Sequence, residues 1–300
     1  MNDKRGVTFA VITALLWGML AIGVKIVLNE VSAITVVWVR MSIAALGMAL
    51  YFAFKDPAAF SVFTRAPKLI YLPAIGLALN YIGYAKGIEL AGPAATQVVI
   101  QMGPILLCLA GFFLFKEHFI RRQKWGFLLA FVGLVFFYQK QIASMDVGQE
   151  TFLKGVLATL GGAVAWSMYS IAQKILVRTY PVQRINLFIY TFSAIVYAPF
   201  VDFSVFLQLS PWMWVGLLFL GLNTLVAYGS MGEALKYTDA GKVGVIVILN
   251  PILTFILLEL MEYFRLPWLD YTHIPFWAYL GALMMLSGAV LATLRAKKKS

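Results

Sequence analysis

Ten long apolar stretches, separated by short polar segments, follow one another along the whole chain. Each is long enough, at 1.5 Å per residue, to cross the ~30 Å hydrocarbon core of a bilayer. Where the polar segments contain only a few residues, the flanking helices must be antiparallel neighbours. The pattern therefore predicts ten transmembrane helices, near residues 6–28, 34–54, 68–89, 93–115, 122–138, 152–174, 187–207, 211–235, 240–262 and 275–294.

Composition supports a membrane protein. Hydrophobic residues make up 62% of the chain, charged residues 12%, and the mean hydropathy is +0.85. A water-soluble domain of this size cannot bury so much apolar surface. The one cysteine, Cys108, excludes a disulfide framework, and the first apolar stretch is too long for the core of a cleavable signal peptide.

The basic residues predict the orientation of the helices. If the N-terminus is cytoplasmic, 18 of the 24 Lys and Arg residues fall on the inner side, as the positive-inside rule requires. We therefore expect both termini in the cytoplasm of a multi-pass protein of the cytoplasmic (inner) membrane. The 18 basic residues on the inner side are Lys4, Arg5, Lys55, Arg65, Lys68, Lys116, Arg121, Arg122, Lys124, Lys174, Arg178, Arg184, Lys236, Lys242, Arg295, Lys297, Lys298 and Lys299.

The two halves of the chain share a weak internal repeat. ALLWGMLAIGVK aligns with GAVAWSMYSIAQK, which matches Trp17 to Trp166. GIELAGPAATQVVIQMGPIL aligns with ALKYTDAGKVGVIVILNPIL, which matches Pro104 to Pro251. FKEHF then matches LMEYF, and a change in the alignment offset indicates about ten extra residues around RLPWLDYTHI.

Five spans in each half is an odd number, so equivalent helices run in opposite directions. We therefore predict an all-α membrane protein built from two inverted five-helix repeats, with a site between the halves and alternating access by rocking. The predicted divisions are a first repeat at 1–140, an outer connecting loop at 141–151 and a second repeat at 152–300.

Together, these features resemble the drug/metabolite transporter superfamily, EamA type. The motifs that carry the resemblance are the tryptophans of helices 1 and 6, the prolines of helices 4 and 9 and the FKE sequence at the end of helix 4. The resemblance implies export or exchange of amino acids, other small metabolites or toxic organic compounds, through a cavity lined chiefly by helices 1, 3, 4, 6, 8 and 9. An Arg inside helix 2 and the long loop after helix 9 depart from the common pattern.

Polar side chains in helices 3 and 4 are candidates for binding a substrate. Gln97 and Gln101 are four residues apart and share a helix face, as do Asn80 and Tyr84. In hydrocarbon such groups are costly unless they face the bundle interior or water. They either bind a polar ligand or join neighbouring helices by hydrogen bonds.

Aromatic residues at related positions of the two halves are the second group of candidates. Trp17 and Trp166 lie near mid-span, Tyr169 follows one turn after Trp166, and Tyr81 aligns with Tyr228. Such side chains are typical walls of small-molecule pockets, although most aromatic residues of this chain must simply pack or face lipid.

Charged residues within or near the spans have several interpretations. Arg40 lies ~10 Å below the outer end of helix 2. It either extends to the interface, pairs with an acid such as Glu89, or binds an anionic group. Lys86 and Glu89 near the outer end of helix 3, and Glu233 near the inner end of helix 8, are candidate gate charges or ordinary interfacial residues.

Pro104 and Pro251 each remove a backbone donor in mid-helix, so we expect kinks there and hypothesise that they are hinges. Glycines of helices 5 and 10 are expected to allow close helix packing, with a homodimer as one interface that they would permit. They are Gly126, Gly133, Gly281 and Gly288.

No enzyme signature is present, and we expect neither a metal nor another cofactor. His118 and His273 are predicted at opposite faces of the membrane, and no phosphate-binding loop for ATP occurs. The expected partners are a small-molecule substrate and the lipid bilayer, and no nucleic acid. The sequence thus favours a secondary transporter, and more specifically an exporter, of amino acids or similar metabolites. Import or exchange of a small organic anion, or a non-transporting receptor or assembly role, are the alternatives.

Overall fold

The computed structural model describes residues 3–143, 150–263 and 276–293, and every regular element in these ranges is a helix. The predicted insertion around RLPWLDYTHI, His273, the basic C-terminal segment and most of the connecting loop at 141–151 lie outside the described residues. The α-helices are α1 (Asp3–Val27), α2 (Ala33–Lys55), α3 (Val62–Arg65), α4 (Tyr71–Ile100), α5 (Met102–Phe113), α6 (Arg121–Ala143), α7 (Glu150–Leu176), α8 (Val182–Tyr197), α9 (Pro211–Tyr237), α10 (Ala240–Val247), α11 (Asn250–Tyr263) and α12 (Phe276–Thr293). Short 3₁₀ turns occupy Pro57–Ser61, Lys68–Ile70, Ala198–Phe200 and Phe203–Leu207.

Helical structure occupies all ten predicted ranges in the described part of the chain, and several ends follow from local chemistry. The Ser32 hydroxyl accepts a hydrogen bond from the Thr35 N–H and caps the start of α2. Pro211 opens α9, at a position where a missing N–H costs nothing. The prediction for 187–207 was wrong at both ends, because α8 begins at Val182 and ends at Tyr197, where the chain turns into Ala198–Phe200 with Pro199 in that turn.

Three interruptions divide the long central helices. α4 continues across Gly92, whose φ of 81° is open to glycine at little cost, so the predicted loop at 90–92 is a kink. α4 gives way to α5 at Gln101, and α10 gives way to α11 at residues 248–249. The predicted kinks therefore exist, but Pro104 and Pro251 lie in the first turn after each break, where proline fits a helix, and not at its centre.

Six of the described helical segments are long and apolar enough to cross a membrane. They are Asp3–Val27, Ala33–Lys55, Ala95–Phe113, Glu150–Leu176, Pro211–Tyr237 and Ala240–Met261. Pro57–Arg65 and Lys68–Gly92, bent by 96° at their junction, would make a seventh if they form one span. This criterion supports a multi-pass membrane protein, while the number ten remains a prediction.

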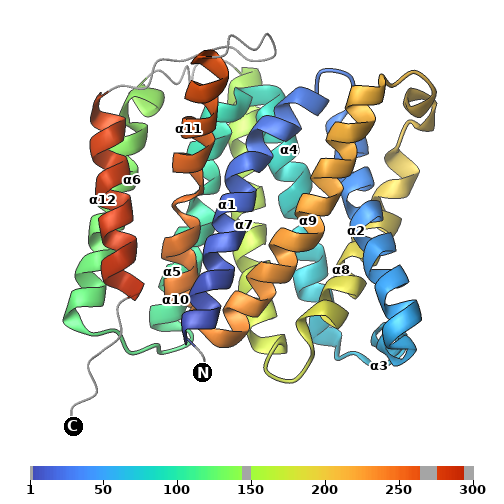
Figure 1. The fold of residues 1–300 in the computed structure, drawn as a ribbon, viewed down its shortest axis with the longest axis horizontal. Helices are drawn as coiled ribbons and strands as arrows, with labels where there is room; N and C mark the ends of the chain where they lie inside the picture. The colour runs from blue at the N-terminus through green and yellow to red at the C-terminus, as the bar shows by residue number, and fades with distance from the viewer. Residues whose placement is uncertain (1–2, 144–149, 264–275, 294–300) are drawn as a thin grey trace.

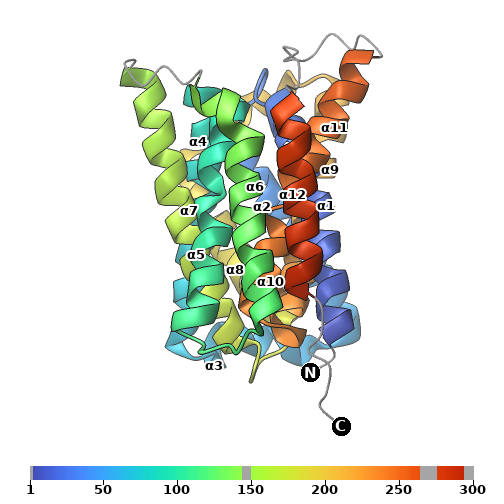
Figure 2. The same ribbon diagram turned by 90° about the vertical axis from the view of Figure 1, so that its left-hand side faces the viewer.

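The long helices stand side by side in one bundle (Figure 1). α6 and α12 pair at one edge, α2 packs on α8 and α9 toward the other, and α1 packs on α9 as α4 packs on α7. α1 begins and α12 ends at the same end of the bundle, the lower end in Figures 1 and 2.

Glycines bring the backbones of paired helices together, as predicted. A Cβ atom added at Gly126 would lie 2.5 Å from the Ala292 amide nitrogen and 2.7 Å from the Gly288 carbonyl oxygen. Gly133 meets Gly281 and Met285 of α12 in the same way. These glycines therefore serve a contact within the chain between α6 and α12, and a homodimer stays a prediction that would need other surfaces.

Candidate functional site

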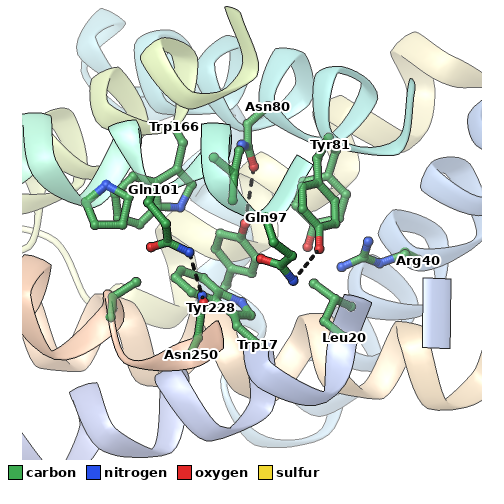
Figure 3. A pocket seen from close by; sticks show the side chains of 14 residues that line it. Trp17, Leu20, Arg40, Asn80, Tyr81, Gln97, Gln101, Trp166, Tyr228 and Asn250 are labelled. Carbon is green, nitrogen blue, oxygen red and sulfur yellow. Dashed lines mark hydrogen bonds between the residues drawn. The ribbon is translucent and has the colours of Figure 1, made fainter. Parts of the chain in front are cut away.

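A central cavity lies among α1, α2, α4, α5, α7, α9, α10 and α11. The space between its side chains, with the open space at its mouth, is about 550 Å³. Residues from both halves of the sequence point into it (Figure 3). The lining residues are Trp17, Leu20, Arg40, Asn80, Tyr81, Tyr84, Gln97, Ile100, Gln101, Pro104, Trp166, Tyr228, Val247 and Asn250.

Nine of the ten residues predicted to bind a substrate line this cavity. The exception is Tyr169, which is fully buried and packs against Tyr228 at 5.5 Å between ring centroids. Because Tyr169 lies three residues after Trp166 on α7, a small difference in direction places its ring behind the cavity wall. Its predicted role as a contact is therefore better replaced by support of Tyr228.

Aromatic rings related by the predicted repeat meet in one wall. Trp17 and Trp166 lie edge to face with their ring centroids 5.8 Å apart, and Trp17 lies 5.1 Å from Tyr228. Tyr81 and Tyr228, aligned in the sequence, are 5.6 Å apart. These rings offer an apolar surface to an apolar or aromatic group of a ligand.

The amide side chains do not all play the same part. Asn80 donates to the Gly162 carbonyl oxygen of α7 at 3.0 Å, so it joins two helices as well as lining the cavity. Gln97 donates to the Tyr84 hydroxyl at 3.2 Å, and Gln101 donates through Nε2 to Asn250 Oδ1 at 3.1 Å. The carbonyl oxygen of Gln101 is buried and accepts no hydrogen bond from the described residues.

Arg40 is buried, with 2% of its surface exposed, and it lines the cavity. Its Nε donates to the Thr224 hydroxyl at 3.1 Å, and its guanidinium lies 4.3 Å from the centre of the Tyr81 ring. Extension of Arg40 to the interface was therefore a wrong interpretation, because the side chain points inward. Pairing with Glu89 was also wrong, because Glu89 pairs with Lys86 at 2.7 Å. Binding of an anionic group is the interpretation that remains.

Two residues of this region were missed in the sequence. Neither Asn250 nor Thr224 is among the site residues predicted from the sequence. Asn250 could have been found from its amide chemistry next to a helix break. Thr224 contacts Arg40 and Tyr81 from a distant part of the chain, and no local signal indicates this.

Below the cavity, toward the end where α1 begins, α5 and α10 pack without a gap. A Cβ atom added at Gly244 would lie 2.7 Å from the Pro104 carbonyl oxygen and 2.6 Å from Cys108 Sγ. The Cys108 thiol donates to the Gly241 carbonyl oxygen at 3.2 Å. The cavity is therefore closed on this side by direct helix contact.

A cluster of five charged residues and one threonine, here named the α10 network, surrounds the N-terminus of α10 below that contact. It consists of Asp3, Glu117, Lys174, Thr238, Asp239 and Lys242. Lys242 pairs at 3.1 Å with both Asp3 and Asp239. Glu117 accepts hydrogen bonds from the Ala240 and Gly241 N–H groups at 2.7 and 3.0 Å, and Lys174 lies 4.0 Å away.

Glu117 is the most enclosed carboxylate of this network, with 8% of its side chain exposed. Burial raises the pKa of Glu117 above its ordinary value, because loss of hydration outweighs the hydrogen bonds from Gly241 and Ala240 and the attraction of Lys174. The FKE motif thus supplies a buried carboxylate cap for the start of α10, a role that the sequence alone did not indicate.

The candidate gate charges do not meet across helices. Lys86 and Glu89 pair on the same helix, with 38% and 39% of their side chains exposed. Glu233 is half-buried on α9, and no ion pair joins it to another described residue. In the described part of the chain, the ion pairs that link segments distant in sequence at this end are those of the α10 network and the pair of Arg184 with Asp56 at 2.8 Å, and a gate role for the predicted three stays a prediction.

Known proteins give an independent view of this architecture. The profile of the EamA-like transporter family matches residues 4–139 and 153–294. The uncharacterized inner membrane transporter YhbE of Escherichia coli (strain K12) is 32% identical over 295 residues, which cover 96% of this chain and 91% of that protein. A more distant relative is the aromatic amino acid exporter YddG of Ancylobacter novellus, 25% identical over 78% of this chain and 79% of its own length.

A solved crystal structure has the same fold. Its TM-score is 0.76, and the match covers 97% of each chain at 20% sequence identity. At this identity the similarity supports the arrangement of helices alone.

Proposed function

The chain belongs to the EamA-like transporter family and is a multi-pass transporter of the inner membrane; from this premise we propose that it exports small metabolites, such as amino acids or related organic compounds, by alternating access. The observation that carries the proposal is the central cavity, whose wall joins Trp17 and Tyr81 of one half to Trp166 and Tyr228 of the other. A pocket between two halves is where such transporters bind their substrate. Amino acids are the first choice because a distant relative is named as an exporter of aromatic amino acids.

The packing of the helices supports two inverted five-helix repeats. In the predicted repeat, α1 corresponds to α7, α2 to α8 and α4 to α9. The contact of α1 with α9 then corresponds to that of α7 with α4, and the contact of α2 with α9 corresponds to that of α8 with α4. All four contacts occur. α6 packs on α12 and α2 packs on α8, so each of these helices meets its own counterpart. We take ten spans to be the architecture that this symmetry favours.

The charges support an orientation with both termini in the cytoplasm. Many of the basic residues that the positive-inside rule assigns to the cytoplasm lie in or beside the segments at the end of the bundle where α1 begins and α12 ends. Reporter fusions at the C-terminus, active only in the cytoplasm or only outside it, test this assignment directly.

Alternating access requires that the contact below the cavity opens. The close packing of α5 on α10 at Gly244 fits a state closed toward the cytoplasm. The breaks before Pro104 and Pro251 lie beside this contact, so a change of angle there would separate the lower halves of both helices. Release of the α10 network would have to accompany it.

A second candidate, import or exchange of a small organic anion, is favoured by one observation. Arg40 brings a positive charge to the cavity, and no acid among the described lining residues balances it. A non-transporting receptor is less favoured, because the cavity and the unpartnered Gln101 carbonyl leave room and chemistry for a ligand.

Counterflow in proteoliposomes tests the proposal. Vesicles loaded with unlabelled metabolites should accumulate the matching labelled compound through the wild type. Gln101→Ala and Trp166→Ala should each lose this activity at least ~10-fold, since a buried contact contributes on the order of 1.4 kcal/mol or more. Trp277→Phe, on an exposed face of α12, is the matched control and should transport normally. Equal losses in all three variants would argue against the site, and no counterflow with any compound would argue against transport.

A further inference from the structure

Arg40 is the only charged residue among the described residues that line the cavity. The other lining groups are amides, phenols, indoles and apolar side chains. A buried guanidinium without a counter-charge is costly in protein and in membrane, by several kcal/mol. The positive charge of Arg40 is therefore the most unusual electrostatic feature of this site.

The neighbours of Arg40 hold it in place and leave its charge unbalanced. Thr224 accepts from Nε on one side and also accepts a hydrogen bond from the Tyr81 hydroxyl at 3.2 Å. The Tyr81 ring covers one face of the guanidinium. Thr224 and Tyr81 are neutral, so they orient the planar group without neutralising it, and it extends toward Gln97 and Tyr81 in Figure 3.

A second unsatisfied group lies in the same cavity. The buried carbonyl oxygen of Gln101 accepts no hydrogen bond from the described residues, because the Gln101 amide nitrogen is the group that bonds Asn250. A buried acceptor without a donor is destabilising, because it has lost its hydrogen bonds to water. The cavity thus presents one cation and, on another wall, one neutral acceptor.

These two groups define complementary chemistry. We propose that the substrate is a small monoanion whose carboxylate binds the Arg40 guanidinium and whose neutral N–H or O–H donor, as in a hydroxy acid or an N-acylated amino acid, bonds the Gln101 carbonyl. A planar guanidinium matches a carboxylate with two parallel hydrogen bonds. The loaded cavity is then electrically neutral and both unsatisfied groups have partners.

A zwitterionic amino acid fits less well. Its carboxylate would pair with Arg40, but its ammonium would enter a cavity with no described acidic residue. The rings of Trp17, Trp166 and Tyr228 would offset little of this, since the attraction of a cation to an aromatic ring is weaker than an ion pair. An uncompensated buried ammonium costs more than that. The charge balance therefore selects the monoanion over the zwitterion of the same shape.

This inference rests on the proposed function, the transport of small metabolites through this cavity, and it replaces amino acids as the first choice of substrate by monoanions of similar shape. It is tested by ligand-induced thermal stabilisation of the purified protein with compounds matched in shape and different in charge. One set is 3-phenyllactate, phenylalanine, 3-phenylpropionate and phenethylamine, and a second is lactate, alanine, propionate and ethylamine. A ligand at 100 times its Kd adds ~2.7 kcal/mol to stability, which a melting curve detects.

The hydroxy acid should give the largest stabilisation within at least one set, the acid without a donor a smaller one, and the amine none. Stabilisation led by the zwitterion or the amine overturns the inference but leaves transport of metabolites intact. No stabilisation by any of these compounds overturns the inference, and counterflow then decides separately whether the proposed function fails as well.

Variants separate a ligand contact from a structural role. Arg40→Gln should weaken binding of the hydroxy acid at least ~30-fold. The neutral amide 3-phenyllactamide, which a glutamine can also bond, should then bind as tightly as the acid. Lys86→Gln removes an equal charge outside the cavity and should change neither compound. Equal weakening by both variants, or the same acid-over-amide preference in Arg40→Gln as in the wild type, contradicts the assignment.

Discussion

The α10 network and the central cavity are both polar, yet they treat their polar groups in opposite ways. In the α10 network, Lys242 lies between two carboxylates and Glu117 receives two backbone hydrogen bonds with Lys174 beside it. In the cavity, Arg40 has no carboxylate partner among the described residues and the Gln101 carbonyl has no donor. Lys174 and Lys242 of the network are buried, as Arg40 of the cavity is, so exposure alone does not explain the difference.

The difference separates polar groups that stabilise the fold from polar groups that lack a partner until a ligand binds. A buried polar cluster whose members satisfy one another rigidifies a structure, whereas an unsatisfied one lowers stability until a partner binds. The α10 network joins the start of α1, the loop before α6, the end of α7 and the start of α10. It is therefore expected to carry stability, and the cavity to carry binding.

The largest expected effect is on the α10 network. Glu117→Ala leaves the Ala240 and Gly241 N–H groups without an acceptor and Lys174 without its nearby carboxylate, so it should destabilise the protein by ~3 kcal/mol. Unfolding in detergent measures this. Glu89→Ala breaks the exposed pair with Lys86 and is the control, with an expected loss below ~1 kcal/mol. Equal losses would remove the contrast between the network and an ordinary surface pair.

A smaller effect is expected from Thr224, which positions Arg40 without lying in the cavity lining. Thr224→Val keeps the shape of the side chain but removes the acceptor for Arg40 Nε and Tyr81. Binding of a carboxylate ligand should weaken ~5- to 10-fold, about the value of one typical hydrogen bond. Binding of the matched neutral amide should hardly change, and a uniform loss for both compounds would make Thr224 a general packing residue.

The smallest effect concerns pH. Because the pKa of Glu117 is raised in the folded protein, the folded state holds this proton more tightly than the unfolded state does. The contribution of Glu117 to stability is then full below about pH 4.5 and falls as the pH rises through the folded pKa. Melting temperatures of the wild type and Glu117→Gln should therefore converge or cross over this window, and parallel curves would contradict the raised pKa.

The fold was largely predictable because its signals are local. Apolar stretches of membrane-spanning length indicate helices whatever their neighbours are, and the paired prolines marked both breaks to within three residues. The end of α8 was mispredicted, since the apolar residues after Tyr197 continue into 3₁₀ turns instead of a helix. Hydrophobicity alone does not distinguish these structures.

The residues that line the cavity were predictable from the sequence, but their hydrogen-bond partners were not. Amide, phenol and indole side chains in an apolar background are costly unless they face the interior, so Gln97, Gln101 and Trp166 stood out. The partner of each is set by tertiary packing: Thr224 reaches Arg40 across 184 positions, and Asp3 reaches Lys242 across 239. Tyr169 has the right chemistry but faces the back of the wall, because side-chain direction within one turn cannot be assigned from composition.

The most direct test of the account measures two quantities on two variants, Lys242→Met and Arg40→Gln: stability without ligand, and the stabilisation that 3-phenyllactate adds. Lys242→Met should lower ligand-free stability by ~3 kcal/mol, because it removes the ion pairs with Asp3 and Asp239, and should retain the ligand-induced shift. Arg40→Gln should not lower ligand-free stability, because it removes a buried charge without a counter-charge, and it should lose the shift. The reverse pattern, with Arg40→Gln unfolding the protein and Lys242→Met abolishing the ligand response, would contradict the division between a stabilising network and a binding cavity.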